Sequence, residues 1–242
     1  PSQFWFKFLN LVWMSAAIIF FYHFAQKIFE NKLMTTISTA LFMLLTTLPW
    51  LEGNIANGEL FVMGFVLAGL WLVSKSNYFM WLLNKQKKKG NSFWLFLGSV
   101  FFGLAILTKV PALLDLGVIL VIAWFKFSHA LFAKKQFKSA LIQFFKEVGL
   151  ILAGVATPIL LSIAYYVAIG SGQDYLRYGL LYNFHYVSTW THNFGSPLVN
   201  FLMTLKGKLL LLTLVFVSLT LLKKKISKIS KFLFGWLALS LF

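Results

Sequence analysis

Acidic residues are scarce in this sequence, and cysteine is missing altogether. Only six of its 242 residues are Asp or Glu, against 22 Lys or Arg, and charged residues make up 12% of the chain. A soluble domain carries about 25% charged residues, so this chain has too little polar surface to cover a soluble globule. Without cysteine the sequence supports no disulfide framework, no thiolate chemistry and no cysteine-ligated metal.

Apolar residues are correspondingly abundant. They make up 60% of the chain, the mean hydropathy is +0.80, and the long apolar runs are separated by short lysine clusters. Lipid cannot pair with backbone polar groups, so each run is predicted to be helical. We therefore expect an all-α, polytopic transmembrane bundle with about seven spans, at 5–27, 33–50, 58–75, 92–109, 111–127, 147–169 and 203–222, plus a truncated one at 231–242.

The distribution of the basic residues argues against nucleic-acid binding. If the predicted spans alternate in direction, 17 of the 22 basic residues fall in the segments on one side of the membrane. The other side holds only Lys7, Lys109, Arg177, Lys206 and Lys208. Cytoplasmic loops are enriched in Lys and Arg, so the N-terminus is predicted to lie outside and the protein to span a plasma (inner) membrane several times.

Both ends of the chain look cut. The first residue is Pro, and the last apolar run, 232–242, is far shorter than the roughly 20 residues that a helix needs to cross a bilayer. We expect residues 1–242 to form one transmembrane helical domain that belongs to a longer protein. Within it, 170–200 is predicted to be an extracytoplasmic loop with an amphipathic segment lying on the outer leaflet.

Two of the six acids lie in the turn "PWLEGNIANGELF", between the second and third predicted spans. Glu59 opens the third span, where free backbone N–H groups and the helix dipole favour a negative charge, with Asn57 or Gly58 as the cap. Glu52 fits a solvated turn residue. The alternative is functional: two carboxylates in one small turn could hold a divalent cation or orient a hydroxyl group.

The hairpin "GLAILTKVPALLDLG" places Lys109 and Asp115 around Pro111 at the same predicted side. An ionisable residue at membrane depth costs about 2.5–3.5 kcal/mol on insertion scales, which makes Asp115 a candidate functional residue. One interpretation is a local Lys109–Asp115 ion pair. The other is that Lys109 binds a phosphate such as a lipid headgroup.

The segment 170–200 carries the only arginine of the chain, Arg177, together with several Tyr and two His. The spacing of Tyr175, Tyr178 and Tyr182 fits a helix at the membrane interface, where aromatic residues are common. Arg177 offers a planar fork that suits a phosphate. His185 and His192 could be metal ligands, although their spacing is not one characteristic of a metal site.

Taken together, these stretches resemble the GT-C glycosyltransferases. The acidic turn "ANGELF", the hairpin "GLAILTKVPALLDL" and the segment "YLRYGLLYNFHYVSTW" are similar to family 39, the protein-mannosyltransferase and aminoarabinose-transferase type. The resemblance implies a GT-C-like helical bundle that moves a sugar from a polyprenyl-phosphate carrier to a protein, lipid or glycan acceptor outside the cytoplasm. It implies no nucleotide cofactor, and a divalent metal ion remains possible.

The resemblance also implies roles for particular residues. Glu59 matches the second acidic position of the family and would be a supporting acceptor or metal residue. Substrate contacts would come from Glu52, Lys109, Asp115, Arg177, His185 and Tyr186. The principal catalytic Asp of the family follows its first span, and this chain begins at what resembles the second, so that base is expected outside these residues.

Two other classes of protein fit the same composition. A transporter or flippase for lipid-linked glycans would also be polytopic, with charged or broken helices near the membrane midplane. A structural subunit could use the polar outer segments to contact a partner protein.

Overall fold

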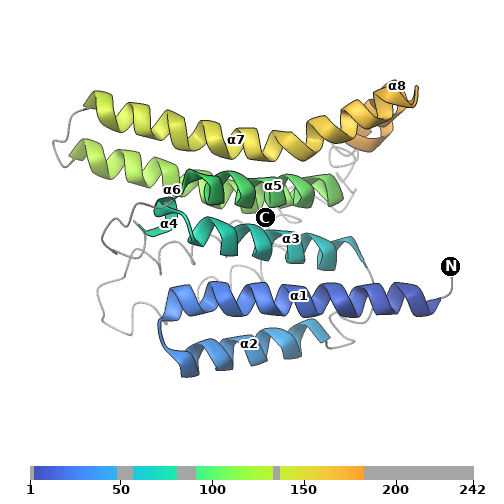
Figure 1. Ribbon diagram of the computed structural model, residues 1–242, viewed down its shortest axis with the longest axis horizontal. Helices are drawn as coiled ribbons and strands as arrows, with labels where there is room; N and C mark the ends of the chain where they lie inside the picture. The colour runs from blue at the N-terminus through green and yellow to red at the C-terminus, as the bar shows by residue number, and fades with distance from the viewer. Residues whose placement is uncertain (1–2, 48–56, 81–90, 133–136, 183–242) are drawn as a thin grey trace, which may run out of the picture. The chain divides into compact units, whose positions relative to one another are not determined.

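The structure is a computed structural model that describes residues 3–47, 57–80, 91–132 and 137–182. The described residues are helical, and they belong to two compact units, Pro1–Ser162 and Ile163–Phe242. The elements, labelled in Figure 1, are α1 (Gln3–Phe29), α2 (Lys32–Thr47), α3 (Gly58–Ser74), α4 (Asn77–Met80), α5 (Ser92–Thr108), η2 (Val110–Ala112), α6 (Leu113–Phe132), α7 (Phe137–Ala168), α8 (Gly172–Asp174) and η3 (Tyr175–Leu181).

The all-helical class is confirmed for the described residues. Three of the helical stretches are long and apolar enough to cross a membrane, namely Phe4–Phe29, Val110–Ala130 and Phe137–Ala168. Helices α2, α3 and α5 are apolar but shorter, with 16 or 17 residues each. The predicted spans at 203–222 and 231–242 lie outside the described residues.

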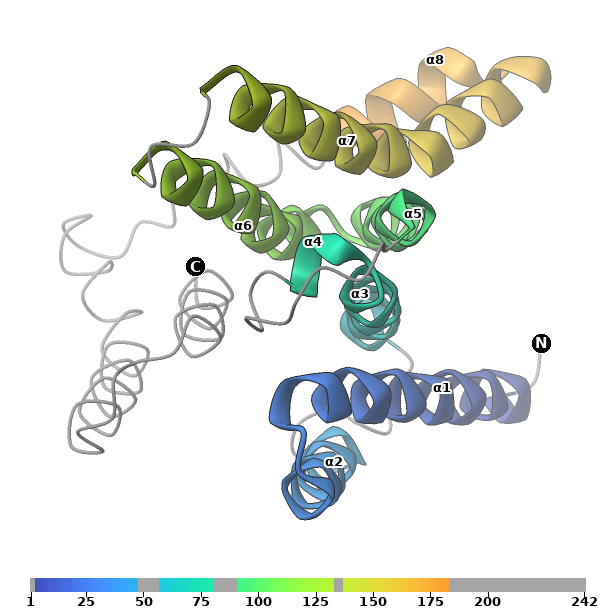
Figure 2. The same cartoon turned by 60° about the vertical axis from the view of Figure 1, so that its left-hand side comes forward.

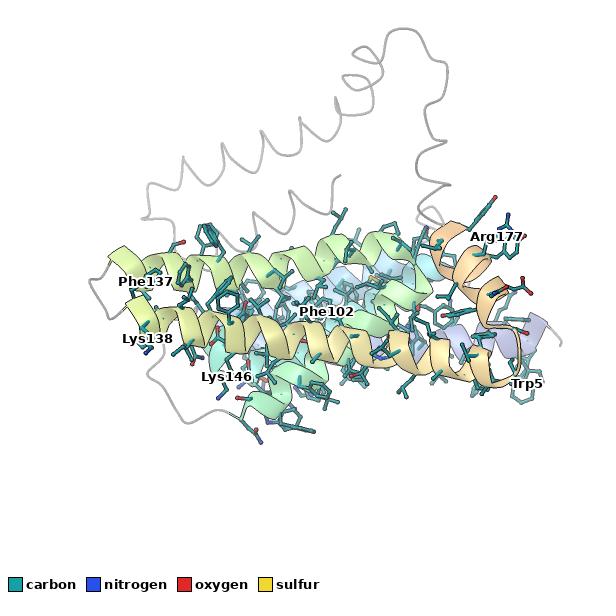
Figure 3. The ribbon with its side chains drawn as sticks, turned by 90° about the horizontal axis from the view of Figure 1, so that it is seen from above. Trp5, Phe102, Phe137, Lys138, Lys146 and Arg177 are labelled. Atoms are coloured by element: carbon teal, nitrogen blue, oxygen red, sulfur yellow. The ribbon has the colours of Figure 1, made fainter. Side chains whose placement is uncertain are left out.

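Most helix boundaries fall close to the predicted ones, and one does not. The third span was expected at 58–75 and α3 covers Gly58–Ser74. The sixth was expected to begin at residue 147, but α7 already begins at Phe137. Lys138 and Lys146 precede the predicted span and so were expected in a loop, but they belong to the first three turns of α7, as Figure 3 shows.

Helices α3 and α5 form the centre of the first unit. They are antiparallel, because Gly69 lies against Phe102 while Val73 lies against Gly98. The two backbones approach so closely that a β-carbon on Gly98 would lie 2.8 Å from the carbonyl oxygen of Gly69. Phe102 is fully buried in this contact, and Figure 3 shows it in the interior of the helices.

Helix α1 packs against α3 and runs in the same direction (Figure 1). Near the start of α3, the indole of Trp13 donates a hydrogen bond to the carbonyl oxygen of Leu60 over 3.3 Å. Eleven residues further along α3, the Trp71 ring stacks on Phe20 with 5.5 Å between centroids. Gly64 leaves room for the Trp13 indole, because a β-carbon there would lie only 2.4 Å from the indole nitrogen.

Helices α2 and α7 pack on the outside of α1, α3 and α5. Helix α2 follows α1 directly and packs back against it, as Figure 2 shows, with the Phe21 and Phe42 rings stacked at 4.4 Å. The middle of α7 packs against α5 through small residues, since a β-carbon on Gly154 would lie 2.5 Å from the carbonyl oxygen of Phe96. Small residues allow such close backbone contacts between apolar helices.

The second unit contains the end of α7, then α8 and η3. Helix α7 stops because Gly170 adopts a positive φ of 78°. The N–H groups of Gly170 and Ser171 bond back to the carbonyls of Val167 and Tyr166, the usual pattern of a glycine-terminated helix. After this turn the ring of Tyr175 stacks on Tyr166 at 4.1 Å, which fixes the start of η3 against the end of α7.

Candidate functional site

The first turn of α3 positions Glu59. The side-chain oxygen of Asn57 accepts a hydrogen bond from the N–H of Leu60 over 3.1 Å, so the cap is Asn57, one of the two residues that the sequence indicated. Glu59 follows two residues later, where the positive end of the helix dipole stabilises its carboxylate. Its side chain is 60% exposed.

The end of α5 positions Lys109. The Lys109 backbone is extended, with φ −157° and ψ 124°, and its N–H closes the last turn on the carbonyl oxygen of Ala105. Pro111 follows in η2, where it cannot continue the α5 hydrogen-bond pattern, and α6 starts at Leu113. The chain thus turns back sharply, with Lys109 at the bend.

Because α3 and α5 are antiparallel, the start of one lies beside the end of the other, and Glu59 and Lys109 meet. The Lys109 ammonium forms an ion pair with Oε1 of Glu59, across 50 positions of sequence. This hydrogen bond from Lys109 lowers the pKa of Glu59 below its ordinary value of 4.5; Glu59 lies outside the three candidate spans. The lysine side chain is 46% exposed, so the pair is accessible to ligands.

The structure describes only some of the other predicted site residues. Asp115 lies in the first turn of α6, six positions after Lys109 and at the same end of the hairpin. Arg177 lies in η3, in the second unit, with its guanidinium carbon 5.5 Å from the ring centroid of Tyr178. Glu52, His185 and Tyr186 lie outside the described residues. Of the predicted set, the structure brings Glu59 and Lys109 together.

The carboxylate turn that was considered for a divalent cation is only half described, because Glu52 lies outside the described residues. Within the described part of the chain, no three side chains of His, Asp or Glu lie close enough together to hold an ion. Glu59 and Lys109 combine a carboxylate that can accept a hydrogen bond from a hydroxyl with an ammonium group that can bind a phosphate.

Sequence reasoning missed a second ion pair. Lys126 of α6 and Glu147 of α7 were assigned to the edges of predicted spans, but they lie inside these helices and pair with each other. Their side chains are only 16% and 9% exposed. Gln143, one turn before Glu147, donates a further hydrogen bond to the same carboxylate oxygen over 2.7 Å.

Tyr78 covers this buried pair. The Lys126 ammonium lies 4.6 Å from the centroid of the Tyr78 ring, and the Tyr78 hydroxyl donates a hydrogen bond to the carbonyl oxygen of Ile119. Tyr78 is 2% exposed and belongs to the four-residue helix α4, which the sequence analysis did not predict. The sequence signal for this pair was a lysine and a glutamate near the ends of two predicted spans. Their spacing in the sequence does not show that they pair with each other.

Comparisons with known proteins give this chain no relative: no family model, no curated protein and no solved structure matches it. Its class therefore comes from the structure itself. The described residues form an all-helical protein with three helices of a length and composition suited to crossing a membrane.

Proposed function

We propose that this chain is part of an integral-membrane glycosyltransferase of GT-C type. The enzyme takes a sugar from a polyprenyl-phosphate donor and passes it to an acceptor on the extracytoplasmic side of a plasma (inner) membrane. The proposal includes about seven spans and an N-terminus outside. These finer features rest on the lysine distribution and on the resemblance of the sequence to family 39.

The observation that carries the proposal is the Glu59–Lys109 ion pair. Both residues were singled out by their motifs, and they come from segments 50 positions apart. A lipid-linked donor carries its phosphate at headgroup depth, where an ammonium group on a helix end can reach it. Lys109 would bind that phosphate. Glu59 would then lose its ion-pair partner, and its carboxylate would be available to a hydroxyl of the acceptor.

The division of roles follows from charge. With Lys109 in place, Glu59 is held ionised, which suits a group that orients a hydroxyl or accepts its hydrogen bond. A strong general base needs a raised pKa instead, so Glu59 supports the reaction and the principal base lies elsewhere in the protein. Asp115 lies at the same end of the hairpin and is a further substrate contact in this scheme.

The buried Lys126–Glu147 pair favours a second candidate, a transporter or flippase for lipid-linked glycans. Charged residues inside helices are costly in a membrane and often mark a substrate or proton pathway. Lys126 and Glu147 are residues of this kind, because both lie inside helices. The transferase remains the better supported proposal, because the buried pair has an internal partner and a hydrogen bond from Gln143.

One experiment separates the two candidates. The full-length protein, reconstituted in vesicles, is supplied with a polyprenyl-phosphate sugar and its transfer to acceptors is measured for Glu59→Gln, Lys109→Gln and Arg177→Ala. The transferase predicts that sugar transfer falls at least tenfold in Glu59→Gln and Lys109→Gln. Unchanged transfer in all three variants would remove the site assignment, and lipid movement without sugar transfer would support the transporter.

A further inference from the structure

A cluster of cationic and aromatic side chains lies at the other end of α3, seventeen residues from Gly58. We call it the Lys75 cluster, and it consists of His23, Lys27, Trp71, Lys75 and Trp94. The residues come from three helices: the end of α1, the end of α3 and the start of α5. Because α3 separates the two ends, the cluster is distinct from the Glu59–Lys109 pair.

Lys75 is held between two indole rings. Its ammonium lies 3.6 Å from the centroid of the Trp71 ring and 4.7 Å from that of Trp94. Trp71 makes a further aromatic contact, because the His23 ring stacks on it with 5.6 Å between centroids. Cation–π contacts of this kind orient an ammonium group but leave its charge uncompensated.

A second lysine acts on Lys75. Lys27 lies in the last turn of α1, and it is the charged group that acts on Lys75 among the described residues. Burial, and then repulsion from Lys27, lower the pKa of Lys75. Two neighbouring ammonium groups are stabilised when an anion lies between them.

The start of α5 adds to this preference for an anion. Asn91 caps the helix by accepting a hydrogen bond from Phe93 N–H, and Trp94 lies in the first turn. The 17-residue helix therefore directs the positive end of its dipole toward the indole that holds Lys75.

The cluster also lies next to apolar surface. Ile19 and Phe29 of α1 are 55% and 41% exposed on either side of His23 and Lys27 in the sequence. Indole rings favour the depth of lipid headgroups, with apolar side chains toward the acyl chains. Basic pockets between helices at the lysine-rich side of membrane proteins bind anionic headgroups.

We propose that the Lys75 cluster binds the phosphate of an anionic phospholipid, with the Lys27 and Lys75 ammonium groups on the phosphate oxygens and the acyl chains along α1. The ligand is a resident lipid of the lysine-rich side, separate from the sugar donor. The inference depends on the protein lying in a membrane and not on sugar transfer.

The test uses the purified full-length protein in detergent, with phosphatidylglycerol as the probe and phosphatidylcholine as the zwitterionic control. Bound lipid is counted by native mass spectrometry for the wild type, Lys27→Gln, Lys75→Gln and the charge-conserving Lys75→Arg. A lysine near a membrane surface changes the affinity for anionic lipid by roughly fivefold, so each Gln variant is expected to weaken phosphatidylglycerol binding by about that factor. Lys75→Arg is expected to keep most of the binding.

Lys32→Gln is the matched control, because Lys32 is an exposed lysine at the start of α2, just beyond the end of α1, and outside the cluster. An equal loss of phosphatidylglycerol in Lys32→Gln would mean diffuse attraction and would overturn the proposal. Binding of phosphatidylcholine as strong as that of phosphatidylglycerol would also overturn the proposal. Displacement of the lipid by an excess of inorganic phosphate would overturn it too, because soluble phosphate would then be the ligand. If Lys75→Gln is not stably produced, the comparison of Lys27→Gln with Lys32→Gln decides.

Discussion

Gly69 and Gly98 face each other across the antiparallel helices α3 and α5, and each lies against the backbone of the other. A β-carbon on Gly69 would lie 3.0 Å from the carbonyl oxygen of Gly98, and one on Gly98 would lie 2.8 Å from that of Gly69. The hairpin that brings Glu59 to Lys109 therefore depends on two residues without side chains. Backbone atoms, unlike a flexible side chain, cannot move aside cheaply.

Gly98→Ala is expected to destabilise the protein. The added methyl group would also lie 2.7 Å from Cγ2 of Val73, and overpacking of this kind costs about 1–3 kcal/mol. Alanine recovers at most about 1 kcal/mol through its higher helix propensity. The measurement is the thermal unfolding midpoint of the protein in detergent, which should fall.

Gly117→Ala in α6 is the control for this substitution. No atom lies within 4 Å of a β-carbon built there, so helix propensity should leave its midpoint equal to or above that of the wild type. Equal midpoints for Gly98→Ala and Gly117→Ala would show that the α3–α5 contact is not as close as described.

The buried pair of Lys126 and Glu147 should respond strongly to loss of one partner. Lys126→Met leaves the Glu147 carboxylate buried with Gln143 as its remaining hydrogen-bond donor, and breaking a buried pair costs about 3–5 kcal/mol. We expect a large drop in the unfolding midpoint or in the yield of folded protein.

The double variant Lys126→Met/Glu147→Leu should recover most of that loss, because no buried charge is left unpaired. Lys146→Met, next to Glu147 but exposed, is the control and should change stability little. A double variant that is no better than Lys126→Met would point to a role for the charges beyond their mutual pairing.

The exposed Glu59–Lys109 pair should contribute little to stability. Exposed pairs have coupling energies of about 0.2–1 kcal/mol, and salt weakens them further. A double-mutant cycle with Glu59→Gln and Lys109→Gln, followed by thermal unfolding at low and high salt, measures this coupling. A coupling far above that range would assign the pair a structural role in the hairpin and weaken its assignment to substrate binding.

The same pair gives a pH dependence of defined sign. The folded-state pKa of Glu59 is lowered from 4.5, so its carboxylate stabilises the fold fully above that value. This contribution is lost as the pH falls through the lowered pKa. The midpoint difference between the wild type and Glu59→Gln should therefore be constant near neutral pH and shrink in acid; a difference that grows in acid would contradict the ion pair.

Tyr78→Phe is expected to cost about 1 kcal/mol, the usual net value of one buried hydrogen bond, here the bond to the carbonyl of Ile119. The ring stays in place and continues to cover Lys126. Tyr165→Phe, at a side chain that is 62% exposed, should leave the unfolding midpoint unchanged. Equal effects at the two positions would mean that the buried hydroxyl has no special partner.

Much of the helix pattern could be predicted because apolar runs and polar breaks alternate along the chain. The start of α3 was predicted by Asn57 and Glu59, both of which act locally at a helix terminus. The start of α7 was placed ten residues late, because Lys138 and Lys146 were counted as loop residues. A helix can carry such lysines beyond an apolar stretch when their side chains remain exposed, as that of Lys146 does.

The site was harder to predict than the helices. Glu59, Lys109 and Asp115 were each singled out, and the one local pairing considered joined Lys109 to Asp115. The ion pair that Lys109 forms is with Glu59, fifty positions away, and it depends on the register of α3 against α5. That register is set by Gly69, Gly98 and Phe102, whose mutual contacts leave no periodic signal in the sequence.

The unequal lengths of α1 and α3 have a consequence for the surrounding lipid. Trp13 is level with Leu60, so α1 extends beyond the start of α3 by about eight residues, or roughly 12 Å at 1.5 Å per residue. That overhang carries Phe4, Trp5 and Phe8, all largely exposed. With Glu59 and Lys109 at headgroup depth, α1 is longer than the local thickness of the bilayer, and α1 must tilt or the bilayer must thicken around it to keep these rings in lipid.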